Sequence, residues 1–319
     1  MDPVRVAVIG VGTFGQNHAR VYSQSPDAQL VAVVDRDAER ANSVAKQFAC
    51  KALGNIEDLA GKIDAVSLAV PTPLHAEIGG QLLEAGIDLL VEKPIAANLA
   101  ESDRLIEAAS SNDRILQVGH LERFNPAIEE AFGIADLPLF FEVHRLNQFS
   151  PRSLDVDVVL DLMIHDLDIV LALAKSPIER IEASGVPVLS TRADISSVRM
   201  VFENGCVANL TASRVSTEKV RKLRFFQPRQ YVSVDYASQN GVTIRLDEQN
   251  RPHFQQLRPS REEPLTRQLA AFLESVRTRT PPLVGGAAAK TARDAALRIR
   301  AEMERHAALV EATLQAHKS

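Results

Sequence analysis

Short apolar runs alternate with segments of helical spacing along the first part of the chain. Val, Ile and Leu dominate the runs at 4–9, 30–34, 65–70, 89–91 and 115–118. Apolar residues at helical intervals occupy the stretches around 14–24, 38–48, 74–85 and 99–110. Continuous apolar strands that alternate with helices are typical of a parallel sheet buried on both faces. The pattern predicts a doubly wound α/β domain over residues 1–121.

Beyond residue 121 the spacing becomes that of an antiparallel sheet. A helix is expected over 156–174, after a turn region at 151–155. Strand-like runs follow at 178–189, 196–202, 207–213, 220–226, 231–236 and 242–246. Asn204-Gly205 and Asn240-Gly241 are hairpin turn signals, and helical spacing returns around 264–279 and 288–317. We therefore expect residues 122–319 to form an α+β domain with a mostly antiparallel, open-faced sheet and C-terminal helices.

The composition of the 319 residues is that of an ordinary globular protein, 45% hydrophobic and 24% charged. A net charge of −5 argues against nucleic acid or an anionic membrane as the main partner. Two cysteines, Cys50 and Cys206, are too few for a disulfide framework and suit a reducing compartment. No apolar stretch approaches the ~20 residues of a membrane helix, and a strand beginning at Val4 leaves no room for a signal peptide. We expect a cytoplasmic protein.

A glycine motif follows the first predicted strand and opens the first helix, with the sequence Gly10-Val-Gly12-Thr13-Phe14-Gly15. In this setting the first glycine permits a tight turn, the second lets backbone approach a pyrophosphate, and the third allows close helix–strand packing. The helix N-terminus adds amides and the positive end of its dipole. The motif predicts a dinucleotide site of the Rossmann type; the alternative is a glycine turn that serves packing alone.

Two further loops at the strand ends carry candidate cofactor contacts. Asp35 ends the second strand, 20 residues after Gly15, where a carboxylate binds the adenosine ribose and repels a 2′-phosphate. This favours NAD, while Arg36 leaves NADP possible because arginine can meet a phosphate. The loop after 65–70 is expected beside the ribose and the nicotinamide. Its candidate contacts are Pro71, Thr72 and His75.

A carboxylate and an imidazole lie four residues apart in the helix expected at 156–174. This spacing stacks Asp161 and His165 on one helical face, so Asp161 can orient His165 and raise its basicity. A histidine held in this way is a suitable proton acceptor near neutral pH. Taken alone, such a pair is more often structural.

The glycine motif, Glu92-Lys93-Pro94 and Asp161-x-x-x-His165 together resemble the Gfo/Idh/MocA oxidoreductase family over essentially the whole chain. The resemblance implies an NAD(P)-dependent dehydrogenase that acts on sugars, inositols or related polyols. It implies that Lys93 is the active-site lysine, that Asp161 and His165 are the catalytic pair, and that Glu92 lies near the cofactor. It also implies that the open sheets pair between subunits, in a homodimer or homotetramer.

The chain departs from the family pattern before Asp161, where many members carry glycines and this chain has Leu-Asp-Val-Asp-Val-Val at 154–159. The sequence at 154–159 and the segments 118–126 and 145–152 resemble a branch of the family that oxidises UDP-N-acetylglucosamine at C3. This oxidation precedes amination in lipid A assembly. Arginine matches phosphate geometry. Candidate substrate residues that could bind the diphosphate are therefore Arg123, Arg145, Arg152 and Arg214. His120 is a further candidate substrate residue because it follows a predicted strand of the first domain.

Oxidation of a hydroxyl requires that a proton leave oxygen and a hydride leave carbon. NAD takes the hydride, His165 is the candidate base, and a positive Lys93 beside the same oxygen would favour alkoxide character. Which of the two takes the proton is left open. Asp157, Asp161, His165 and Asp168 have metal-compatible spacing, but hydride transfer to NAD requires no metal, and none is predicted.

Two alternatives remain beside the nucleotide-sugar dehydrogenase. One is an inositol or simple-sugar dehydrogenase of the same family. The other is a dinucleotide-binding regulator without catalysis, which would have no need of Lys93 together with Asp161 and His165.

Overall fold

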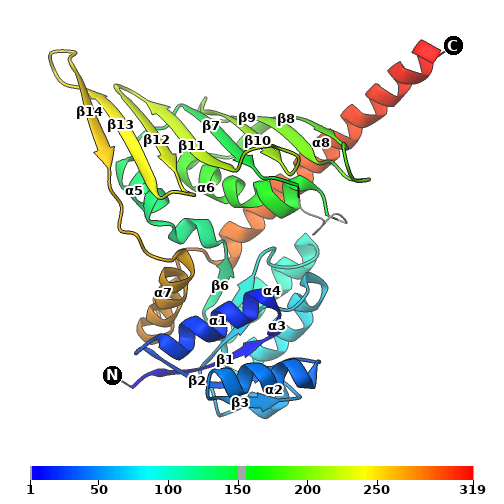
Figure 1. Ribbon diagram of the computed structural model, residues 1–319, viewed down its shortest axis with the longest axis vertical. Coiled ribbons are helices and arrows are strands. Elements are labelled where there is room, and N and C mark those ends of the chain that lie inside the picture. The colour runs from blue at the N-terminus through cyan, green and yellow to red at the C-terminus, as the bar shows by residue number, and fades with distance from the viewer. Residues whose placement is uncertain (1, 150–155, 319) are drawn as a thin grey trace. The chain divides into compact units, whose positions relative to one another are not determined.

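The computed structural model describes residues 2–149 and 156–318. The chain divides into two compact units, residues 1–124 with 263–290, and residues 125–262 with 291–319 (Figure 1). The predicted fold class is confirmed, because one unit is built on a parallel sheet and the other on a mostly antiparallel one. Among the described residues, no helix has the length and apolar character that a bilayer crossing requires.

The first unit contains a six-stranded parallel sheet in the order β3-β2-β1-β4-β5-β6. Its strands are β1 Val4–Ile9, β2 Ala28–Val34, β3 Lys51–Leu53, β4 Ala65–Leu68, β5 Asp88–Glu92 and β6 Leu116–Gly119. The strand order reverses direction between β1 and β4, and ligands of doubly wound sheets bind beyond the strand ends at this switch point. The loops after β1 and β4 are thereby brought together.

Helices cover both faces of this sheet, as the apolar strands predicted. Val6 and Val8 of β1 pack with α1 and α7, while Ala7 and Ile9 face the opposite side with α3 and α4. The helices are α1 Thr13–Gln24, α2 Ala38–Gln47, α3 His75–Glu84, α4 Leu99–Ser111 and α7 Pro264–Thr278. The three-residue edge strand β3 was not predicted, since Lys-Ala-Leu carries too short a pattern.

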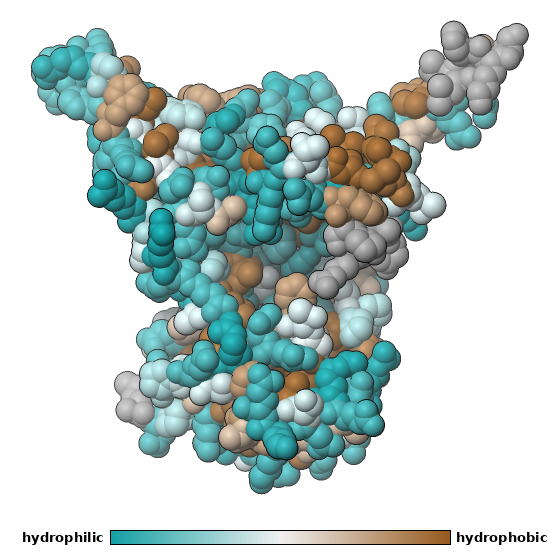
Figure 2. Space-filling model, viewed as in Figure 1, coloured by the Kyte–Doolittle hydropathy of each residue, from teal (hydrophilic) through white to brown (hydrophobic). Residues whose placement is uncertain are grey.

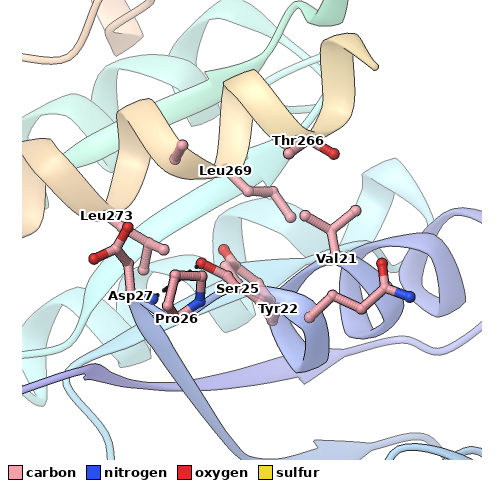
Figure 3. Close-up of a pocket in the computed structure, with 10 residues that line it drawn as sticks. Val21, Tyr22, Ser25, Pro26, Asp27, Thr266, Leu269 and Leu273 are labelled. Carbon is pink, nitrogen blue, oxygen red and sulfur yellow. Dashed lines mark hydrogen bonds between the residues drawn. The ribbon is translucent and has the colours of Figure 1, made fainter. Parts of the chain in front are cut away.

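Helix α7 packs on the first unit, although the sequence analysis placed it in the second domain. Leu269 and Leu273 point from α7 toward Val21 and Tyr22 of α1, above a small pocket (Figure 3). Arg277 of α7 also pairs with Asp27 at 2.7 Å. An amphipathic terminal helix carries no local signal for the core that it will cover, so this return to the first unit could not be predicted.

The second unit contains an eight-stranded sheet in the order β14-β13-β12-β11-β7-β10-β9-β8, antiparallel except for the pair β7 and β10. Its strands are β7 Phe140–Leu146, β8 Ile178–Val186, β9 Ile195–Phe202, β10 Val207–Ser213, β11 Val220–Gln227, β12 Gln230–Asp235, β13 Asn240–Leu246 and β14 Pro252–Leu257. The six predicted runs are all strands. Two strands were not predicted. One is the central strand β7, whose inward positions include the charged Arg145, and the other is the exposed edge strand β14.

Helices cover one face of the second sheet (Figure 1). Phe141 and Val143 of β7 point into a core that α5 Pro126–Ile134, α6 Ile164–Ala174 and α8 Gly286–Lys318 complete. On the surface of this unit, Val188 and Leu189 are more than half exposed. Figure 2 shows an apolar area, coloured brown, near the free end of α8.

The helix predicted over 156–174 has two different parts. Val159–Met163 form a π-helical segment, η4, and α6 continues from Ile164. The expectation of one regular α-helix is therefore corrected at its first turn. Apolar periodicity does not distinguish a π-turn from an α-turn, because the two differ by one residue.

Candidate active site

The glycine loop of the first unit has the geometry that its three glycines predicted. Gly10 has φ +82°, and a Cβ there would lie 2.8 Å from the backbone of Ala69. A Cβ on Gly15 would lie 1.8 Å from the Gly10 carbonyl oxygen, so only glycine allows α1 to pack this closely. A Cβ on Gly12 would meet no described atom within 4 Å. The loop is thus packed at its first and third glycines and open at the second.

Gly12, which has open space around it, lies at the exposed N-terminal end of α1. Gly12 is the N-cap of this helix and supplies no side-chain cap, and Thr13 and Phe14 beside it are exposed, Phe14 to 66%. Free helix N-terminal amides with the positive dipole end attract phosphate groups. The arrangement can hold an anionic diphosphate.

Asp35 lies at the end of β2 and is tied to the glycine loop. Its carboxylate accepts hydrogen bonds from the Val11 amide at 2.8 Å and the Asp37 amide at 2.9 Å. Arg40 Nη1 lies 3.5 Å from the same carboxylate, a neighbour that the sequence analysis missed, while Arg36 is exposed. These bonds fix the Asp35 carboxylate next to the loop that the pyrophosphate would occupy.

His75 joins the loop after β4 to the turn after β5. Pro71 and Thr72 lead into the short helix η2 Thr72–Leu74, and His75 begins α3. The buried ring has Nδ1 3.0 Å from the Pro94 carbonyl and Nε2 2.9 Å from the Val70 carbonyl. Burial lowers the pKa of His75, which favours the neutral ring. A neutral ring has one N–H and donates to one of these two carbonyls, while the buried ring packs between the loop after β4 and the turn after β5.

Glu92 is anchored beside α1 at the end of β5. Its carboxylate lies 3.1 Å from Nε2 of the buried His18, and a Cβ on Gly119 would come within 2.8 Å of it. Lys93 follows directly, half-buried in the turn before Pro94. His18 was missed, although its position three residues after Gly15 puts it on the inward face of α1. The contact fixes the strand end that carries Lys93.

Asp161 and His165 lie in the second unit, on the π-helical segment and the first turn of α6, and both are partly buried. π-turns within helices are frequent at functional sites. Asp157 precedes the segment, and its Oδ1 accepts from the Val159 amide at 3.0 Å and the Leu160 amide at 3.1 Å. Among the described residues, Asp157, Asp161, His165 and Asp168 do not gather into a group that could hold a metal ion.

Arg145 and Arg214, two of the candidate phosphate ligands, are engaged inside the second unit. Arg145 is 2% exposed and forms two bonds with Asp166, at 2.8 and 3.0 Å. The hydroxyl of Tyr236 bonds to the same carboxylate, and its ring lies 5.3 Å from the Arg145 guanidinium carbon. Arg214 is 5% exposed and donates to the Val156 carbonyl. Both arginines therefore hold the surroundings of α6.

The remaining substrate candidates differ in their surroundings. His120 and Arg123 are buried in the first unit, His120 just before the short helix η3 Leu121–Phe124 and Arg123 within it. Arg152 and the turn region predicted at 151–155 lie outside the described residues. Asp166 follows His165 directly in the chain, so the pair with Arg145 fixes α6 beside the candidate base.

Comparison with known proteins agrees with this geometry. The Gfo/Idh/MocA oxidoreductase family with NAD-binding Rossmann fold matches residues 4–120, and the Gfo/Idh/MocA C-terminal domain matches residues 139–230. UDP-N-acetylglucosamine 3-dehydrogenase of Acidithiobacillus ferrooxidans is 35% identical over 95% of this chain and 98% of its own length. A solved structure of that enzyme superposes with a TM-score of 0.90, covering 96% of this chain and 99% of that one.

A second type of relative matches less of the chain. The NAD-dependent scyllo-inositol 2-dehydrogenase of Bacillus subtilis is 29% identical over 67% of this chain and 68% of its own length. Both relatives are dehydrogenases, and both family models fall within the units described here. The chain belongs to the Gfo/Idh/MocA family of oxidoreductases, and its first unit is built on the family's NAD-binding Rossmann fold.

Proposed function

We propose that this protein oxidises the C3 hydroxyl of UDP-N-acetylglucosamine to a ketone, with NAD as the hydride acceptor. The observation that carries the proposal is the extent of similarity, which spans 95% of this chain and 98% of a UDP-N-acetylglucosamine 3-dehydrogenase. The inositol dehydrogenase covers only 67% of the chain. A 3-keto sugar is ready for amination, so the proposed place of the reaction is in the supply of an amide-linked lipid A precursor in the cytoplasm.

The first unit has the residues that an NAD molecule needs. Gly10, Gly12 and the N-terminus of α1 would hold the pyrophosphate, and Asp35 would bind the adenosine ribose. When bound, NAD supplies the acceptor for the hydride. The anionic Asp35 disfavours the 2′-phosphate of NADP.

Lys93, Asp161 and His165 are proposed to handle the proton. His165 takes the proton of the substrate hydroxyl, and Asp161 orients the ring and stabilises the imidazolium that forms. The ammonium of Lys93 stabilises negative charge that develops on the substrate oxygen, an electrostatic effect of about 3 kcal/mol where such donors have been removed. In the reverse direction the same groups polarise and protonate a ketone.

A substrate panel tests the proposed reaction. NADH formation is measured with UDP-N-acetylglucosamine, UDP-glucose, myo-inositol and scyllo-inositol, and the product is trapped with borodeuteride to locate the ketone. We expect turnover of UDP-N-acetylglucosamine with deuterium at C3. Brisk oxidation of the inositols without oxidation of UDP-sugars would instead support the inositol dehydrogenase.

The regulator alternative is tested with two variants. Lys93→Ala and His165→Ala are each expected to lower kcat by about 10²–10⁴-fold, the usual contribution of an acid–base group, with NAD affinity retained. NAD binding is measured by calorimetry, so that a loss of chemistry is separated from a loss of the cofactor. Unchanged biological activity of both variants would favour a regulator.

We also propose that the protein is a homodimer or homotetramer that pairs through its second sheet. On the face opposite to α5, α6 and α8, an apolar row crosses the strands in register. It consists of Val207, Phe140, Phe226, Tyr231, Ile244 and Phe254. Neighbouring rings lie 5.7 Å apart for Phe140–Phe226 and 5.0 Å for Phe226–Tyr231. Phe226 and Phe254 are exposed and the other members of the row are partly buried; a contiguous apolar row that solvent reaches is typical of an interface.

Light scattering tests the assembly. The wild-type protein is expected at twice or four times the chain mass of 34.9 kDa, and Phe226→Asp in the middle of the row should shift it toward the monomer. Leu137→Asp, an exposed apolar position outside the sheet, is the control. A monomeric wild-type protein would contradict this proposal.

A further inference from the structure

The first turn of the helix that carries Asp161 is held by an ion pair with a distant part of the chain. Asp157 uses its Oδ1 to cap the amides of Val159 and Leu160. Its other oxygen, Oδ2, lies 2.8 Å from Nε of Arg300 on α8. Asp157 is buried and Arg300 about one-third exposed. One carboxylate therefore links the start of the π-helical segment to α8.

A second arginine holds the residue just before Asp157. Arg214 donates to the Val156 carbonyl, and its Nε lies 3.5 Å from the fully buried Asp194. Burial alone would raise the pKa of the Asp194 carboxyl. The carboxylate accepts hydrogen bonds from the amides of Val188, Leu189 and Ser190, and these bonds lower the pKa to about 2. Asp194 is thus a fixed anion that keeps Arg214 in place. Arg214 therefore holds Val156, and Arg300 holds the next residue, Asp157.

The held segment determines which way Asp161 faces. A π-turn contains one more residue than an α-turn, so residues before it are rotated by about 100° relative to an unbroken α-helix. Asp161 lies in the middle of η4 Val159–Met163, and His165 follows in α6. A shift of the segment to α-helical register would turn Asp161 relative to His165.

The rest of α6 is held independently. Asp166 is fixed by Arg145 and Tyr236, and Leu167 and Val170 are fully buried in the core of the unit. Loosening the start of η4 would therefore displace Asp161 while His165 keeps its place. This separation makes the Asp157–Arg300 pair a candidate for setting the geometry of the catalytic pair without touching substrate.

We propose that Asp157 and Arg300 are positioning residues that hold η4 in π-helical register and thereby orient Asp161 toward His165. The inference rests on the proposed function for the roles of Asp161 and His165. Asp157 also falls in the stretch where this chain departs from the glycines of the family pattern. Its partner Arg300 is supplied by the C-terminal helix α8.

Four variants and one control test the proposal. Arg300→Met and Asp157→Ala remove the pair, Arg300→Lys keeps its charge, and Asp157→Asn keeps the cap without the ion pair. Arg305→Met is the control, because Arg305 lies on the same helix and pairs only at the surface, with Glu302 at 2.7 Å. Hydrogen exchange of peptides covering 158–163 is followed by mass spectrometry. The ¹⁵N resonances of the His165 ring, assigned with His165→Gln, report changes in the surroundings of the ring.

Arg300→Met and Asp157→Ala are expected to speed exchange in 158–163, to shift the His165 resonances and to lower kcat by about tenfold, with KM for NAD unchanged. Arg300→Lys should recover most of the loss in kcat. The kcat of Asp157→Asn should lie between those of Arg300→Lys and Asp157→Ala. Arg305→Met should match the wild type.

Wild-type exchange and wild-type His165 resonances in Arg300→Met would overturn the proposal, whatever the effect on kcat. The proposal is also overturned if Arg305→Met changes the exchange in 158–163 and the His165 resonances as much as Arg300→Met does. These two measurements need no substrate, so they decide the inference even if the wild-type protein oxidises none of the proposed sugars. In that case the proposed function alone fails.

Discussion

The two units organise their charged groups in different ways. In the first, the carboxylate of Asp35 is fixed by backbone amides of Val11 and Asp37, and the open end of α1 is made by glycine. In the second, the groups around α6 are fixed by arginine–carboxylate pairs that join separate elements, Arg145 with Asp166 and Arg300 with Asp157. The Asp35 carboxylate is thus held by backbone amides, and the surroundings of α6 are held by long-range side-chain pairs.

This difference has an energetic consequence. The backbone amides of Val11 and Asp37 remain when the Asp35 side chain is replaced. A substitution there should therefore change ligand binding by the glycine loop more than it changes the stability of the unit. A buried ion pair leaves an uncompensated charge when one partner is removed, which is costly. Substitutions in the second unit should therefore act first on stability.

The largest effect is expected for Arg145→Ala. Both members of the Arg145–Asp166 pair are 2% exposed, so the variant leaves a buried carboxylate without its guanidinium and should lose about 3–5 kcal/mol of unfolding free energy. The matched control is Arg224→Ala, whose pair with Glu142 on β7 has a similar length of 3.0 Å but is about one-third exposed. It should lose less than about 1 kcal/mol.

Urea denaturation followed by circular dichroism measures both variants against the wild type. A loss for Arg145→Ala no greater than that for Arg224→Ala would contradict the contrast between the two kinds of region. It would mean that Tyr236, which shares the Asp166 carboxylate, compensates for the missing guanidinium.

A smaller effect separates two glycines of the same loop. Gly15→Ala places a Cβ 1.8 Å from the Gly10 carbonyl oxygen, and such overpacking should cost about 1–3 kcal/mol of stability. Gly12→Ala meets open space and should cost less than about 1 kcal/mol, as alanine replaces glycine at an N-cap.

Gly12→Ala should nevertheless weaken NAD binding, because its methyl group occupies the space of the pyrophosphate. Thermal unfolding gives the stability of each variant and calorimetry gives its NAD affinity. Equal stability of the two variants would contradict the packing difference between the two glycines, and full NAD affinity of Gly12→Ala would show that the loop does not bind the cofactor as proposed.

The same contrast explains what the sequence could predict. Gly10 to Gly15 and Asp35 lie within one strand–helix–strand unit, where spacing alone fixes the geometry, and both the fold of the unit and the NAD fingerprint were predicted. Arg145 and Arg214 are predicted as diphosphate ligands because arginine matches phosphate geometry. Their partners in the structure include the Asp166 carboxylate and the Val156 carbonyl, and these contacts depend on strand pairing that periodicity does not specify.

Two other features lay outside the reach of sequence patterns. The central strand β7 carries Arg145 at an inward position, which breaks the alternation of apolar and polar residues that marks a strand. Asp157 and Arg300 lie nearly half the chain apart, and neither has a local signal for the other. His18 is the exception, because its spacing from Gly15 would have placed it on the buried face of α1.

The smallest expected effect concerns the choice of dinucleotide. Asp35→Asn keeps one oxygen that can accept from the Val11 amide, gives up the acceptor for the Asp37 amide, and removes the charge that repels a 2′-phosphate. Arg40, 3.5 Å from that carboxylate, and the exposed Arg36 then become available to a phosphate. The ratio of NADP to NAD affinity should rise by about tenfold, the effect of one charged contact of about 1.4 kcal/mol, while stability stays near that of the wild type. Adding Arg40→Ala to Asp35→Asn should abolish the gain if Arg40 supplies it. Affinities measured by calorimetry decide the point, and an unchanged ratio in Asp35→Asn would show that this carboxylate, although fixed by backbone beside the glycine loop, does not select the cofactor.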